Sequence, residues 1–168
     1  SAWVYRSRFG SLAKAYEQVG FRTERGWDFL EVNRRLRQLH PEIMDRTQHT
    51  IAKTGAHIWR DPKTDLLHLN DELVISLVLA RCQVLPSGRQ RWRIRFDPLH
   101  SASDITVAVR LDQRNETELD YFLLPRMDLP ESGFQVTDQN QADFACFRYD
   151  DLSVLYGLSE RLRLPRRT

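Results

Sequence analysis

Four arginines alternate with other residues over the run RQRWRIRF, residues 89–96. Successive side chains of a β-strand point to opposite faces, so this spacing predicts a strand with one face of arginines. Its other face carries Trp92, Ile94 and Phe96, which suit a hydrophobic core. The members of this arginine row are Arg89, Arg91, Arg93 and Arg95.

Like charges side by side on a strand repel one another, so the arginine row needs an anionic partner. Phosphate is the leading candidate, because the planar guanidinium fork matches the geometry of phosphate oxygens. The alternative is an ordinary basic surface that neighbouring Asp and Glu side chains neutralise.

The residues around the arginine row predict a sheet. The segment VISLVLARCQV is apolar on both faces in its first half, which is typical of a central strand. The turn Pro86-Ser87-Gly88 then predicts a hairpin with the arginine row. Period-two patterns and turn residues together predict strands at 57–60, 66–69, 73–82, 89–96, 105–111 and 121–124.

Helical spacing of apolar residues is found toward both ends of the chain. It predicts helices over 11–19 and 27–40, and Pro41 favours the start of another helix that ends near residue 54. Ile43, Thr47, Thr50 and Ile51 mark the inner face of that third helix. Residues 126–142 are polar and predict a surface loop, and residues 150–162 predict a helix. This order predicts an α+β fold, with N-terminal helices, a mostly antiparallel curved sheet and a C-terminal helix.

The net charge of +2 conceals a gradient along the chain. Residues 1–60 hold eleven Lys and Arg against six Asp and Glu, whereas residues 101–168 hold eight against twelve. Such asymmetry suggests a surface that faces a polyanion. A second basic patch in the first third of the chain comprises Arg8, Lys14, Arg34, Arg35 and Arg37.

Other sequence features bear on the location of the protein. No apolar run approaches the roughly 20 residues of a membrane span, and no secretory signal pattern opens the chain. Cys82 and Cys146 lie in apolar stretches without metal-ligand spacing. We therefore expect a cytoplasmic protein that has no membrane partner.

The segment RFGSLAKAYEQVGF, residues 8–21, resembles the homing-endonuclease-associated repeat, a small helix-turn-helix-like unit that binds DNA. The residues that match its core, helix and exit are Phe9, Gly10, Ser11, Leu12, Ala15, Tyr16, Val19, Gly20 and Phe21. Similar segments follow the catalytic parts of bacterial serine site-specific recombinases, and the chain resembles such an accessory C-terminal region. The repeat's usual preceding helix is absent, so we expect residues 1–22 to form a partial motif and residues 23–168 to form one α+β domain.

The same segment has a physical interpretation. Gly10 permits a tight bend, and Ser11 is suited to cap a helix whose free N–H groups can meet a phosphate beside Arg8 and Lys14. The alternative is a capped amphipathic helix that only packs on the sheet.

A nuclease is the enzymatic alternative. Asp65, Asp71 and Glu72 precede a strand hairpin that loosely resembles the PD-(D/E)XK nuclease core. That core uses carboxylates to hold Mg²⁺ and a lysine to position the attacking water. Here the second strand offers Leu79-Ala80-Arg81, which lacks both the acid and the lysine. The enzymatic alternative is therefore a degenerate, non-cleaving nuclease-like fold, which would need Mg²⁺ only if it cleaved DNA.

The C-terminal half also carries a group of acids. These residues lie near an expected turn and favour a solvated face or a partner for the arginine row over a metal site. They are Asp104, Asp112, Glu116, Glu118 and Asp120.

The charge pattern favours DNA binding without catalysis, and the resemblance implies an accessory domain of a bacterial mobile-element or recombination protein. Its expected partners are double-stranded DNA and a recombinase catalytic domain, in the same chain or a neighbouring one. A protein-interaction module of a recombinase is the remaining alternative. The expected DNA contacts are Arg8, Gly10, Ser11, Lys14, Arg34, Arg35, Arg37, Arg81, Arg89, Arg91, Arg93 and Arg95.

Overall fold

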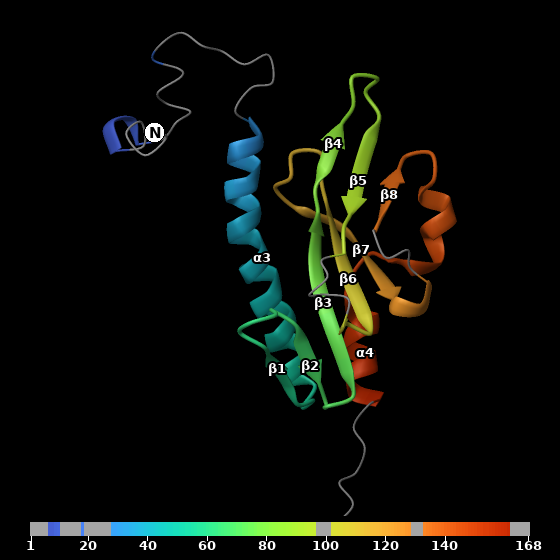
Figure 1. Cartoon of the computed structure of the whole chain (residues 1–168). Coiled ribbons are helices and arrows are strands. Elements are labelled where there is room, and N and C mark those ends of the chain that lie inside the picture. Colours follow the sequence, from blue (N-terminus) through green and yellow to red (C-terminus); the bar gives the residue numbers. More distant parts are fainter. Residues whose placement is uncertain (1–6, 11–17, 19–27, 97–101, 129–132, 162–168) are drawn as a thin grey trace, which may run out of the picture. The chain divides into compact units, whose positions relative to one another are not determined.

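The computed structural model describes residues 7–10, 18, 28–96, 102–128 and 133–161 (Figure 1). The chain divides into two compact units, Ser1–Arg37 and Gln38–Thr168. In the first unit, residues 7–9 are helical and Gly10 follows with a φ of 74°, in agreement with the predicted bend. Of the predicted helix over 11–19 only residue 18, which is helical, is described, and the predicted domain boundary after residue 22 lies outside the described residues.

A single helix, α3 (Asp28–Lys53), replaces the two helices predicted around Pro41. Proline has no N–H group, so the carbonyl of Arg37 loses its usual helical partner, yet the helix continues through this position. In the second unit its apolar face is buried, and Ile43, Thr47 and Ile51 are fully buried as predicted. Burial of this face offsets the missing hydrogen bond, so the predicted helix break is wrong.

The larger sheet has six strands in the order β1-β2-β3-β6-β7-β9. Among the described strands of this sheet, β3 and β6 pair in parallel and the other neighbouring pairs are antiparallel. The central position of β3 between β2 and β6 confirms the prediction for its apolar run. The strands are β1 (Ile58–Arg60), β2 (Leu67–Leu69), β3 (Leu73–Ala80), β6 (Ile105–Leu111), β7 (Glu118–Pro125) and β9 (Arg148–Tyr149).

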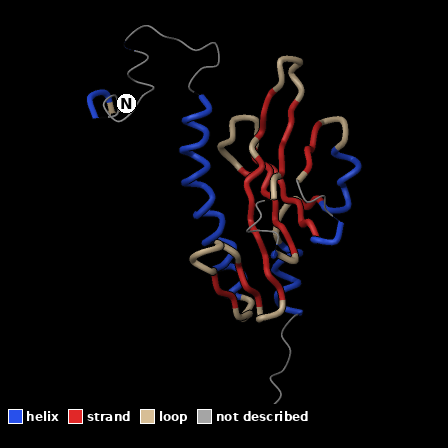
Figure 2. Tube along the Cα trace, viewed as in Figure 1, coloured by secondary structure: helices blue, strands red, loops and turns tan. Residues whose placement is uncertain are grey.

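A second, three-stranded antiparallel sheet has the order β4-β5-β8, where the sequence predicted only one sheet (Figures 1 and 2). Its strands are β4 (Cys82–Val84), β5 (Gln90–Ile94) and β8 (Phe134–Thr137). The predicted strand over 73–82 is divided at Arg81, where the chain passes from one sheet to the other. The Asn115 side chain bonds both the N–H and the carbonyl of Cys82, and so supplies the backbone partners that a neighbouring strand would provide.

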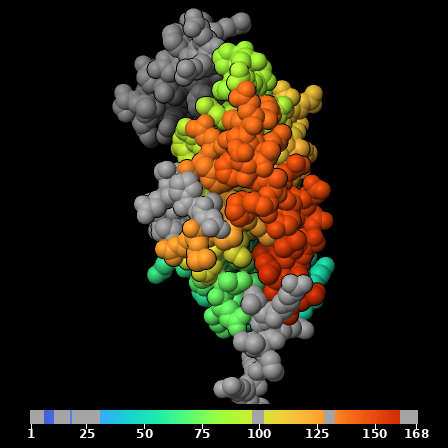
Figure 3. Space-filling model, turned by 90° about the vertical axis from the view of Figure 1, so that its right-hand side faces the viewer, coloured from blue at the N-terminus to red at the C-terminus, as the bar shows by residue number. Residues whose placement is uncertain are grey.

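The polar stretch 126–142 contains regular structure, so its prediction as a loop is wrong. It holds η2 (Arg126–Asp128), β8 and the start of η3 (Gln141–Phe147). The strand β8 has only four residues, and its pairing with β5 stabilises it. The space-filling view shows β8 and η3, in orange, at the surface of this region (Figure 3).

The two sheets share a core. Trp92 and Ile94 of β5 and Val136 of β8 are buried in one cluster with Phe122 of β7. Partly buried Phe96 joins the same cluster, so the predicted apolar face of the arginine strand is confirmed. A C-terminal helix, α4 (Ser153–Arg161), completes the expected α+β fold. None of the described helices is both long and apolar enough to cross a membrane.

Candidate nucleic-acid interface

The arginine row lies on the outer face of the three-stranded sheet. Arg89, Arg93 and Arg95 are exposed and Arg91 is half-buried, whereas the intervening Trp92 has only 2% of its surface exposed. The strand period of two therefore separates the charged from the apolar side chains as predicted.

Glutamine side chains lie beside three arginines of the row. Arg91 donates to Gln83 over 2.7 Å and Arg89 donates to Gln139 over 3.1 Å. Across β8, Arg93 pairs directly with Gln135. The nearby Asp138 carboxylate accepts the backbone N–H of Gln90. Among the described residues no carboxylate forms an ion pair with any arginine of the row, so its positive charge is not neutralised within this part of the chain.

The acids predicted as partners of the arginine row bind elsewhere. Asp120 is fully buried and receives two hydrogen bonds from Arg110, one of them at 2.7 Å, and a third from Arg148 at 2.8 Å. Glu118 binds Arg46 of α3. The expectation that this segment forms a solvated face is thus wrong for Asp120, and no local pattern in the sequence signals its burial.

A hollow of about 410 Å³ lies beside the end of β5 where Arg93 and Arg95 are found. The backbone at this side of the hollow requires a glycine at position 133. Its φ is 83°, and a Cβ atom there would lie 2.2 Å from the carbonyl oxygen of Ile94. The hollow is lined by Arg93, Ile94, Arg95, Gly133, Phe134 and Gln135.

The other predicted DNA contacts lie outside the arginine row. Arg81 is half-buried at the junction of the two sheets. Extending the β4–β5 register by one residue beyond Cys82 places Arg81 opposite Arg93. In the first unit, Arg8, Arg34 and Arg37 are exposed, and Arg34 lies 3.7 Å from Glu31. Arg35 in the same unit is half-buried. The predicted contacts at Ser11 and Lys14 fall outside the described residues.

The structure does not bring the three nuclease candidates together. Asp65 lies in the turn between β1 and β2, where it binds Arg60 at 2.6 Å and lies 3.8 Å from His40. Asp71 and Glu72 lie in the turn at the opposite end of β2. Among the described residues, no three His, Cys, Asp or Glu side chains converge as metal ligands would.

Comparison with protein-family models, with curated proteins and with solved structures finds no match to this chain.

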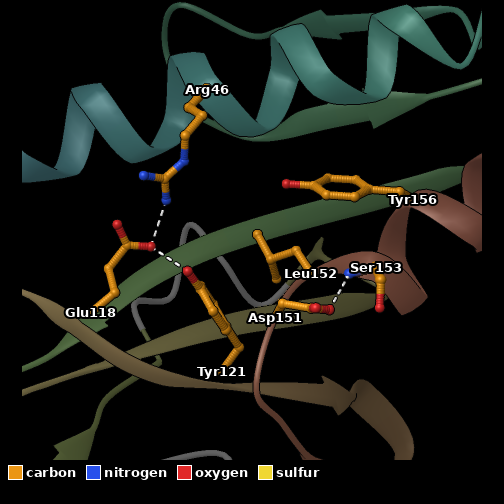
Figure 4. Close-up of a pocket in the computed structure, with 7 residues that line it drawn as sticks. All are labelled: Arg46, Glu118, Tyr121, Asp151, Leu152, Ser153 and Tyr156. Carbon is orange, nitrogen blue, oxygen red and sulfur yellow. Dashed lines mark hydrogen bonds and ion pairs between the residues drawn. The ribbon is translucent and has the colours of Figure 1, made fainter.

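A polar cavity of about 420 Å³ lies away from the arginine row, between α3, β7 and α4 (Figure 4). Glu118 at its wall accepts hydrogen bonds from Arg46 and from the Tyr121 hydroxyl. On the α4 side, the Asp151 carboxylate accepts the backbone N–H of Ser153. The ion pair of Arg46 with Glu118 joins α3 to β7, and Tyr121 supports the same carboxylate; we call these three residues the brace.

This brace predicts a loss of stability at alkaline pH. Burial, together with the hydrogen bond to Glu118, raises the pKa of Tyr121 above its ordinary value near 10. The folded state thus holds this proton more tightly than the unfolded chain does. The contribution of Tyr121 to stability is complete below about pH 10 and declines as the pH rises further. Urea unfolding at pH 9 and pH 11 should show a larger loss for the wild type than for Tyr121→Phe, and equal losses would contradict the assignment.

Proposed function

We propose that this protein binds double-stranded DNA through the outer face of its three-stranded sheet, with the arginine row along the phosphate backbone. The observation that carries the proposal is the arrangement of the row: four arginines share one face, and in the described part of the chain Arg89 and Arg91 donate to neutral glutamines. Because glutamine does not neutralise the charge, the arginines remain available to an external anion.

The dimensions of the sheet support this proposal. The first and last arginine of the row are six positions apart, and at about 3.4 Å per position the row spans about 20 Å. B-form DNA advances about 3.4 Å per base pair, so the row can follow about six base pairs of one strand.

The context in a mobile-element or recombination protein rests on the resemblance of residues 8–21 to the homing-endonuclease-associated repeat and to recombinase accessory regions. In this proposal the first unit supplies a second basic contact through Arg8, Arg34 and Arg37. Catalysis would belong to a partner recombinase domain, and the protein itself would be an accessory DNA-binding part.

A fluorescence-anisotropy titration with a labelled DNA duplex tests the proposal. Neutralisation of four or five phosphates predicts a slope of about −4 in the logarithm of the association constant against the logarithm of salt concentration. Replacing Arg93 and Arg95 with Gln should reduce the steepness of this slope by about two and weaken binding at low salt by about tenfold or more.

The matched control is Lys53→Gln with Arg126→Gln, which removes the same charge from outside the three-stranded sheet. It should change the affinity by less than about threefold. Equal effects of the two double substitutions would show that net charge alone governs binding. Micromolar or weaker binding of the wild type with no dependence on salt would exclude this function.

A further inference from the structure

The β4–β5 hairpin extends past the end of its neighbour β8. The partners of β8 on β5 are Arg91 to Ile94, so residues 84–90 continue as a two-stranded ribbon (Figure 1). Figure 2 shows its tip as a loop beyond the paired strands. The tip is well defined, since Leu85 donates to the carbonyl of Arg89 at 2.9 Å and Gly88 donates to that of Leu85 at 2.8 Å.

Most residues of this ribbon are exposed and none of residues 84–90 is acidic, although the Asp138 carboxylate accepts the Gln90 N–H at the base of the ribbon. Val84 has 48% of its surface exposed although it is apolar, and the tip residues Pro86, Ser87 and Gly88 are exposed as well. Arg89 stands at the base of the tip on the same face as the rest of the arginine row. A projecting segment flanked by cations is complementary in charge to the space between two phosphate chains.

The size of the ribbon matches the DNA major groove. Two residues from Arg91 to Arg89 advance about 7 Å before the turn at 86–88, and two strands lie about 4.8 Å apart. The major groove of B-DNA is about 12 Å wide and about 8.5 Å deep and admits a two-stranded ribbon, whereas the minor groove is only about 6 Å wide.

The aromatic side chains of this sheet do not offer a platform for unpaired bases. Trp92 is buried in the shared core, and Phe134 stacks on Phe144 with 4.7 Å between ring centroids. Proteins that hold single strands commonly stack bases on exposed aromatic rings, so these inward rings favour a duplex as the ligand.

We infer that the β4–β5 hairpin inserts its tip into the major groove of B-form DNA while the arginine row holds the adjacent phosphates. This inference rests on the proposed function and names the form of nucleic acid that the site selects. A hairpin that binds in this way distinguishes DNA from duplex RNA, because the major groove of A-form RNA is deep and too narrow for side chains to read.

The test compares the affinity of the full chain for a 16-base-pair DNA duplex and for an RNA duplex of the same sequence at one salt concentration. We expect the wild type to prefer DNA by about tenfold or more, because groove contacts add to the phosphate contacts that both duplexes offer. A shortened hairpin should bind both duplexes equally, within about twofold. This variant lacks Val84, Leu85, Arg89 and Gln90, so that Pro86-Ser87-Gly88 joins Gln83 directly to Arg91.

Three further variants show whether the lost tip or the lost charge removes the preference for DNA. Arg89→Gln loses the same charge as the shortened hairpin but should keep the preference for DNA. Arg93→Gln with Arg95→Gln should weaken binding to both duplexes and leave their ratio unchanged. If circular dichroism shows that the shortened hairpin does not fold, Ser87→Glu replaces it, because a carboxylate at the tip is repelled inside the groove and should abolish the preference.

The outcomes distinguish this inference from the proposed function. Equal, salt-dependent binding of the wild type to DNA and RNA would overturn the hairpin insertion and leave the phosphate-binding sheet intact. A shortened hairpin that folds and retains the preference would also overturn the insertion. Absence of binding to either duplex would overturn both proposals.

Discussion

Replacing Asp120 with Asn is expected to lower the free energy of unfolding by about 3–5 kcal/mol. Asp120 is fully buried, and its carboxylate is the anion that binds both Arg110 and Arg148. Asparagine removes the negative charge while the two cations stay. Arg110 has only 3% of its surface exposed, so its charge would be left in the core between the sheets without an anionic partner.

The surroundings of Arg110 explain why a rearrangement cannot relieve this loss. Its guanidinium lies 4.4 Å from the centroid of the Trp92 ring and 5.4 Å from that of Phe122. These rings offer cation–π attraction, worth about 2 kcal/mol when desolvated, which is less than the interaction with a buried carboxylate. One nitrogen of Arg110, Nη1, is already buried without a hydrogen-bond partner.

Urea unfolding followed by tryptophan fluorescence measures the effect. Asp150→Asn is the matched control, because Asp150 has 96% of its side chain exposed and lies 3.8 Å from the same Arg148. Its substitution should change the free energy of unfolding by less than about 1 kcal/mol. Adding Arg110→Met to Asp120→Asn should restore part of the lost stability, since it removes the unpaired buried cation. A loss below about 1 kcal/mol for Asp120→Asn would show that this ion pair is not a structural requirement.

Replacing Gly133 with Ala should destabilise the protein by about 2–4 kcal/mol. The backbone at Gly133 is left-handed, with a φ of 83°, which disfavours alanine by about 1 kcal/mol. The added methyl group would also lie 2.2 Å from the Ile94 oxygen and 3.0 Å from the Arg95 Cα atom. Both are backbone atoms, so relief requires β8 to move away from β5, at a further cost of about 1–3 kcal/mol.

Gly88→Ala separates these two contributions. Gly88 has a similar φ of 79°, but a Cβ atom there would meet no atom within 4 Å, so only the conformational cost of about 1 kcal/mol applies. Thermal and urea unfolding of both variants provide the comparison. If the proposed function holds, Gly133→Ala should also weaken DNA binding, because β8 supports the strand that carries the arginine row. Equal destabilisation of the two variants would mean that the close approach at Gly133 has no energetic consequence.

Local patterns account for the parts of the fold that were predicted. The alternation over residues 89–96 depends only on the two-residue period of a strand, and it correctly separated the arginine row from the buried Trp92 and Ile94. The hairpin at Pro86-Ser87-Gly88 was predicted because turn residues act within a few positions of the chain. The inner face of α3 followed from helical spacing in the same way.

Interactions between distant segments account for the errors. Residues 134–137 form β8 because they pair with β5, about 40 positions earlier, and their own polar surroundings carry no sign of this. The continuous apolar run from residue 73 is divided at Arg81 because Asn115 bonds the Cys82 backbone there. The helix α3 continues through Pro41 because its buried face packs on the sheet.

The sequence by itself determined which residues of the arginine strand and of α3 face the core, because side-chain direction follows from the local period of the backbone. Only the tertiary structure decided which charges are neutralised. It placed the carboxylate of Asp120 in the core beside Arg110, and Arg89 and Arg91 beside glutamines, because the pairing of charges depends on distances between segments that are remote in the chain.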